Sequence, residues 1–188
     1  LVVDGNNYWT NTLTFSSSDP LYAGLAPILI SLQTIDNEGV LTLPSGDLIY
    51  GIGQAAIGID GRATLTDPNS LNYDSGNLTV TLTANGTADD RLQVRTTGTG
   101  AGEIGVSGST VSYGGIAIGS VAGGTGVAPL VITLNSTATP VATEALIRNV
   151  TFRNVSSTPA QNRRTVSFVL TDTDGGVTSA STGVRVGL

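Results

Sequence analysis

The strongest constraint on the fold is an alternation of apolar and hydroxyl-bearing residues with a period of two. Between Leu78 and Thr83, leucine or valine occupies each even position and threonine each odd position. Because successive side chains of a strand point to opposite faces, this run has one apolar and one hydroxyl face. Similar runs, rich in β-branched residues, lie at 92–94, 131–134, 150–155, 166–170 and 184–186. The pattern predicts half-buried strands.

Turn signals separate these runs. Glycine stands with Asp, Asn, Ser or a second Gly at 74–76, 85–86, 107–108, 114–115, 123–124 and 174–176. Many short strands joined by such turns are typical of sandwiches and barrels. We therefore expect an all-β fold, a Greek-key β-sandwich, over residues 46–188.

One segment, 138–148, breaks the alternation and favours a helix. Thr139 is a suitable N-cap, Pro140 suits a first helical turn, and Arg148 would lie at the negative end of the helix dipole. We expect one short crossover helix near 139–148.

Residues 1–45 differ from the rest. They hold the single tryptophan, Trp9, beside Tyr8, and strand-like runs at 11–15, 27–34 and 40–43. The stretch 44–47 (Pro-Ser-Gly-Asp) has the character of a sharp turn or boundary. This segment is either an N-terminal arm that pairs with a neighbouring subunit or a set of extra strands of the same sandwich.

Missing residue types exclude much chemistry. The 188 residues contain no Cys, His, Met or Lys. Ser-His-Asp and Cys-His catalysis, ordinary zinc sites, P-loops and Schiff bases are therefore excluded. Carboxylate chemistry such as glycoside hydrolysis remains, but no pair of acids stands in separated environments. We expect a protein that is not an enzyme.

Charge and hydropathy bear on the partners. Fourteen acids against eight arginines give a net charge of −6, which argues against nucleic acid. No apolar run approaches the ~18 residues of a membrane span, so membrane insertion is not expected.

From about Gly58 onward, several segments in one order carry a resemblance to a known family. They are 63–70 (Ala-Thr-Leu-Thr-Asp-Pro-Asn-Ser), 72–80, 100–108, 145–152 and 164–176. Together they resemble the cadherin-like repeats of large bacterial surface proteins, especially cyanobacterial adhesins, which are distantly similar to chondroitin-sulfate-proteoglycan repeats. The resemblance implies a β-sandwich of the cadherin or immunoglobulin type, a secreted or cell-surface location and a structural or adhesive role. It does not cover residues 1–45.

Acidic turns make calcium a candidate ligand. One group comprises Asp60, Asp67, Asn69 and Asp74, and a second comprises Asp172 and Asp174. Calcium takes six to eight oxygens, which carboxylates and loop carbonyls supply. The alternative is that these residues are turn formers that bond their own backbone. We expect no required cofactor and keep calcium as the candidate.

A second motif, Gly100-x-Gly102-x-x-Gly105, matches the dinucleotide-binding fingerprint. That fingerprint requires a helix N-terminus directly after it, whereas residues 106–111 read as strand and turn. We predict a glycine-rich loop.

The N-terminal residues are the candidates for assembly. Leu1, Val2 and Val3 are apolar, and Tyr8 and Trp9 could close the core, anchor a subunit contact or stack on a glycan. We expect a non-enzymatic extracellular structural protein. It would self-assemble into a surface filament or sheath by N-terminal strand addition to a neighbouring copy. The alternatives are one excised repeat of a calcium-stabilised adhesin, joined to neighbouring repeats, and a carbohydrate-binding adhesin domain.

Overall fold

The computed structural model describes residues 39–68, 70–172 and 175–187. The chain divides into two units, Leu1–Asn37 and Glu38–Leu188, and every described residue belongs to the second. In these residues the chain forms thirteen strands and one helix.

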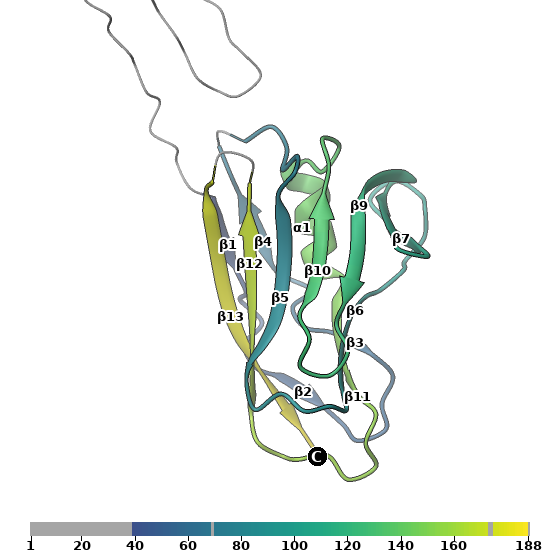
Figure 1. Ribbon diagram of the computed structural model, residues 1–188, viewed down its shortest axis with the longest axis vertical. Coiled ribbons are helices and arrows are strands. Elements are labelled where there is room, and N and C mark those ends of the chain that lie inside the picture. Colours follow the sequence, from purple (N-terminus) through teal and green to yellow (C-terminus); the bar gives the residue numbers. More distant parts are fainter. Residues whose placement is uncertain (1–38, 69, 173–174, 188) are drawn as a thin grey trace, which may run out of the picture. The chain divides into compact units, whose positions relative to one another are not determined.

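One layer is an eight-stranded sheet, which lies in front in Figure 1. Its order is β2 (Leu48–Tyr50), β13 (Val177–Val186), β12 (Arg164–Thr171), β5 (Asn77–Ala84), β10 (Leu130–Leu134), β9 (Ile116–Gly123), β8 (Thr110–Tyr113) and β7 (Ile104–Ser107). Neighbours are antiparallel except β2, which runs parallel to β13.

The other layer combines two small sheets and the helix, which lie behind the large sheet in Figure 1. The three-stranded sheet has the order β3 (Ile57–Gly58), β11 (Val150–Asn154) and β6 (Asp90–Val94), and the two-stranded sheet pairs β1 (Val40–Thr42) with β4 (Thr64–Thr66). The helix α1 (Pro140–Arg148) connects β10 of one layer to β11 of the other. The predicted all-β sandwich with one short crossover helix is confirmed.

The core follows from the alternation. Leu78, Val80 and Leu82 of β5 are buried, and the odd-numbered threonines of that strand lie on the other face. Phe168 of β12 stands opposite Val80 in the register, so it joins the same apolar face. In the core, the ring of Tyr50 packs edge to face against the ring of Phe152, and the two ring centroids lie 5.4 Å apart. These strands are confirmed where the alternation predicted them.

The chain changes layers between β1 and β2. β1 pairs with β4 in one layer, and β2 pairs with β13 in the other. The bend between them contains Pro44 and Gly46, whose φ of +74° is accessible to glycine at little cost. Of the segment 1–45, residues 39–45 therefore lie in the sandwich as an extra strand and its bend. Residues 1–38, with Leu1, Val2, Val3, Tyr8 and Trp9, lie outside the described residues.

The helix begins and ends where its capping residues predicted. The Thr139 hydroxyl accepts the N–H of Ala142 at 3.3 Å, and Pro140 is the first helical residue. Glu144 and Arg148 pair at 2.8 Å one turn apart. In the described part of the chain, no helix is long and apolar enough to cross a membrane.

The glycine-rich motif is a loop up to Glu103, as predicted, and its last glycine, Gly105, lies in β7. The Glu103 carboxylate accepts the N–H of Gly100 at 2.7 Å, and the hairpin of β7 and β8 follows. No helix follows that could hold a pyrophosphate, since α1 starts only at Pro140.

Candidate functional site

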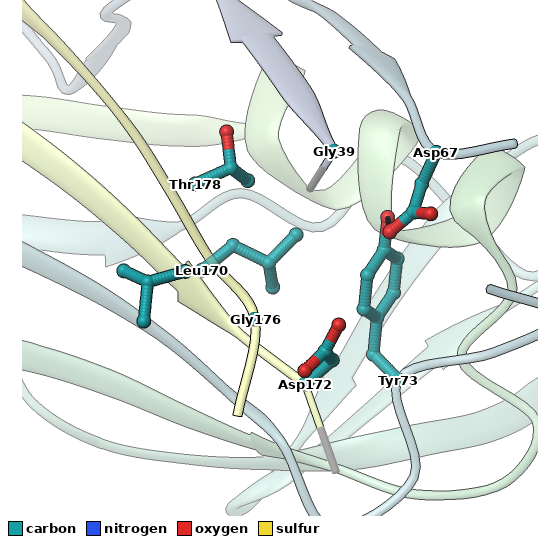
Figure 2. A pocket seen from close by; sticks show the side chains of 8 residues that line it. Gly39, Asp67, Tyr73, Leu170, Asp172, Gly176 and Thr178 are labelled. Carbon is teal, nitrogen blue, oxygen red and sulfur yellow. Dashed lines mark hydrogen bonds between the residues drawn. The ribbon is translucent and has the colours of Figure 1, made fainter. Parts of the chain in front are cut away.

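A small hollow lies at the end of the sandwich where β1 begins. It measures about 10 Å³, the space of about one water molecule. Its walls include Gly39, Asp67, Tyr73, Leu170, Asp172 and Thr178. Figure 2 shows the hydroxyl of Tyr73 directed at Asp67, with Asp172 beside the lower part of the tyrosine side chain.

Hydrogen bonds fix the Asp67 carboxylate. Its Oδ1 accepts the N–H of Ser70 at 3.1 Å, and its Oδ2 accepts the hydroxyl of Tyr73 at 3.2 Å. Burial raises the pKa of Tyr73 well above its ordinary value, and the negative charges of Asp67 and Asp172 raise it further. Tyr73 therefore stays protonated at neutral pH and remains a donor to Asp67.

The structure brings together only part of the candidate calcium set. Asp67 and Asp172 come to one hollow from turns about a hundred residues apart in the sequence. Asp60 lies elsewhere: its buried carboxylate accepts the N–H and hydroxyl of Ser45 at 2.8 and 2.6 Å and fixes the bend before β2. Asp74 lies in a local turn, its N–H bonded to the side chain of Asn72.

The two carboxylates at the hollow do not by themselves supply the oxygens of a typical calcium site. Among the described residues, no three acidic side chains gather where they could hold a metal. Asn69 and Asp174, the remaining candidates, lie outside the described residues. Since calcium needs six to eight oxygens, calcium binding stays a prediction.

A surface ion-pair cluster joins β2 to the neighbouring strands. Asp47, just before β2, accepts Nε and Nη2 of Arg163 at 2.8 and 2.7 Å and Nε of Arg185 at 2.9 Å. The hydrogen bond from Arg163 is the main reason that the pKa of Asp47 falls to about 2, from an ordinary value of 3.8. The side chains of Asp47 and Arg163 cross over Gly183, where an added Cβ would come within 2.3 Å of both.

Sequence reasoning missed a buried polar network. Arg164 and Asp90 are both fully buried, with Nε and Oδ2 at 3.2 Å. The other Asp90 oxygen accepts the side-chain N–H of Asn154 at 2.7 Å. The alternation offered a signal: Arg164 is an even-numbered residue, like Val166 and Phe168, and therefore falls on the same buried face of β12. Neither residue reaches the hollow, so we assign the network to the fold.

Most strand edges in the described part of the chain are covered. The outer edge of β7 is bonded to Thr96 and Thr97, whose hydroxyls accept the N–H groups of Val106 and Ile104. Residues 124–126 cover β6 through Leu92 N–H to Gly124 O and Gly126 N–H to Asp90 O. Helix α1 covers β4, because Glu144 accepts the N–H of Leu65 and Arg148 donates to Ala63 O. By contrast, the first part of β13 has no such cover on the side where β2 pairs with its end.

Comparison with known proteins adds no assignment. No protein-family model, no curated protein and no solved structure matches the chain. The resemblance to cadherin-like repeats therefore stays a prediction, supported by the sequence segments that carry it.

Proposed function

We propose that this protein is a non-enzymatic structural building block of the extracellular surface. Copies of it would assemble in line into a filament or sheath, with the N-terminal segment of one copy adding a strand to the next. The observation that carries the proposal is that the chain enters and leaves the sandwich at opposite ends.

Contacts with β13 locate the two ends. Near the entry, the N–H of Leu41 bonds to the hydroxyl of Thr178, close to the start of β13. Near the exit, the N–H of Gly187 bonds to Tyr50 O, just past its end. The nine residue-to-residue steps from Thr178 to Gly187 span roughly 30 Å at the strand rise of about 3.3 Å per residue. Figure 1 places the C-terminus at the end of the sandwich away from the start of β1.

A domain with entry and exit at opposite ends suits a linear array. A head-to-tail contact between copies that does not close into a ring gives an open filament. The contact residues we assign to the N-terminal segment are Leu1, Val2, Val3, Tyr8 and Trp9, on sequence grounds. Low charge and hydroxyl-covered strand faces fit a cadherin-like module at the cell surface.

The second candidate is one repeat of a calcium-stabilised adhesin, joined to neighbouring repeats. It is favoured by the position of Asp67 and Asp172 beside Gly39, where the chain enters the sandwich. A calcium ion at this junction would stiffen the joint. A glycan-binding role depends on Tyr8 and Trp9 alone, and glycan arrays with Trp9→Ala as the comparison test it.

Negative-stain electron microscopy tests the proposal. The purified chain is imaged with calcium and with a chelator, beside a chain that lacks residues 1–34. We expect filaments from the full chain and none from the shortened one. Monodisperse particles in every condition would refute assembly and leave the single adhesin repeat. Filaments in calcium alone would assign the acidic turns to the joint.

A further inference from the structure

The upper part of β13 is an open strand edge. β13 pairs with β12 along one side from Val177 to Val184, but on the other side β2 pairs only with Val184–Val186. Residues 177–183 have no strand partner on that outer side among the described residues. Thr178 and Thr182 hold the β1 segment through their hydroxyls, which bond to Leu41 N–H and Gly46 O. These bonds use side chains and leave the main chain of the edge available.

The register shows which main-chain groups face outward. On the β2 side, the N–H of Gly187 bonds to Tyr50 O. Alternate residues of a strand direct their N–H and C=O groups to the same side, and β13 pairs with β12 without a shift. The groups of Val177, Ser179 and Ser181 therefore face the open edge, whereas at Gly183 the residues that lead into β2, Gly46 and Asp47, lie alongside.

This edge lacks the usual protection against pairing. Exposed edges commonly carry charged residues, proline or a bulge that blocks another strand. Residues 177–181 (Val-Thr-Ser-Ala-Ser) contain no charge and no proline, and the charged pair of Asp47 and Arg163 lies only at Gly183. The opposite edge of the same sheet, at β7, is by contrast covered by Thr96 and Thr97.

We infer that this edge is the acceptor for residues 27–34 of a second copy of the chain. The inference rests on the proposed function and names its contact. Thirty-eight residues precede the described part of the chain, and they lead into it beside this edge, at Leu41. Residues 27–34 (Pro-Ile-Leu-Ile-Ser-Leu-Gln-Thr) form the longest strand-like run among them and are long enough to cover this edge.

The side chains of the two strands are complementary. In the donor, Ile28, Ile30 and Leu32 would share one face, and Leu29, Ser31 and Gln33 the other. The apolar face would continue the inner surface of β13, where Ala180 is half-buried against the core. Ser31 and Gln33 would lie beside the exposed Ser179 and Ser181 on the hydroxyl face. Hydrogen bonds between the two main chains would then give affinity, and the alternating side chains would set the register of the donor strand on β13.

Disulfide trapping tests the contact directly, because the chain has no cysteine of its own. Full-length Ser31→Cys is mixed with full-length Ser179→Cys under oxidation, and the cross-linked dimers are identified by mass. The matched control is Ser120→Cys, an exposed serine on the same sheet but four strands away. We expect dimers with Ser179→Cys and none with Ser120→Cys. A chain carrying both Ser31→Cys and Ser179→Cys shows whether the bond forms within one molecule instead.

A proline variant tests whether assembly depends on the edge. Ser179→Pro removes an outward N–H that β12 does not use, so the melting temperature should change little. We expect it to lose filaments, whereas Ser179→Thr, which keeps the N–H, should retain them. Wild-type filaments without the cross-link, or unaffected by Ser179→Pro, would overturn this inference and leave the proposed function standing. A bond found only within one molecule would also overturn it. An absence of wild-type filaments would refute the proposed function itself.

Discussion

At the scale of single residues, the least expendable polar contact is the buried pair of Arg164 and Asp90. Arg164 Nη1 donates to the carbonyls of Ala160 and Asn162, and Asp90 also accepts the N–H of Thr87 at 2.8 Å. The network thus ties the loop before β12 to the start of β6. Replacing one partner would leave the other charge buried without compensation.

We predict that Asp90→Asn lowers the free energy of unfolding by about 3 kcal/mol or more. Chemical denaturation monitored by circular dichroism measures it. Asp89→Asn is the matched control, since this neighbouring side chain is exposed, and its cost should stay below about 0.5 kcal/mol. Equal costs at the two positions would contradict a structural role for the pair.

The Asp47 cluster predicts a pH dependence. Because the pKa of Asp47 is lowered from 3.8 to about 2 in the folded protein, its contribution to stability is present above 3.8. The contribution is lost as the pH falls from 3.8 to about 2. We expect the difference in melting temperature between wild type and Asp47→Asn to shrink over this range.

Two further measurements check the cause. Arg163→Gln removes the main hydrogen bond to Asp47, so it should reduce the same acid-dependent difference. Added salt should weaken it too, since the cluster is solvent-exposed. A difference that persists unchanged at pH 2 would show that Asp47 acts by packing and not by charge.

At the scale of elements, local sequence determined most of what could be predicted. Strands β5, β10 and β12 have strong alternation, and α1 has an N-cap and a proline at its start. Strands β2 and β3 escaped prediction because they are three and two residues long. Such segments are too short to show an alternation of apolar and polar residues. They are strands only because they pair with neighbouring strands.

The helix cap gives a prediction at this scale. Thr139→Ala removes the acceptor for the N–H of Ala142 and should cost about 1 kcal/mol. Thermal unfolding measures the loss. The control is Val141→Ala, an exposed position in the same first turn, which should be close to neutral. A similar loss from both variants would mean that contacts of the side chains, and not the cap, stabilise the helix end.

At the scale of the whole molecule, pairing between distant segments was beyond prediction. β2 pairs with β13 from a position more than 130 residues earlier, and the layer change at Pro44 and Gly46 decides which sheet it joins. Alternation identifies the buried face of a strand but not its neighbour. The same limit applies to the candidate site: the sequence grouped Asp60 with Asp67, whereas the fold brings Asp172 to Asp67 and uses Asp60 at the bend.

Calcium binding is the prediction that depends on this arrangement. If a calcium ion binds at the hollow of Asp67 and Asp172, calcium should raise the melting temperature by binding the folded state alone. A chelator should reverse the rise, and Asp172→Asn should abolish it. Isothermal calorimetry measures the binding and differential scanning calorimetry the shift.

The control is Asp89→Asn, whose exposed carboxylate lies outside the candidate set, and it should keep the wild-type response. Asp60→Asn separates the two roles of the acidic turns. Because Asp60 fixes Ser45 and lies apart from the hollow, its variant should be less stable and yet still respond to calcium. If neither heat of binding nor a shift on chelation is found, Asp67 and Asp172 serve the fold through Tyr73 and the turns they close, and the joint between copies must hold without metal.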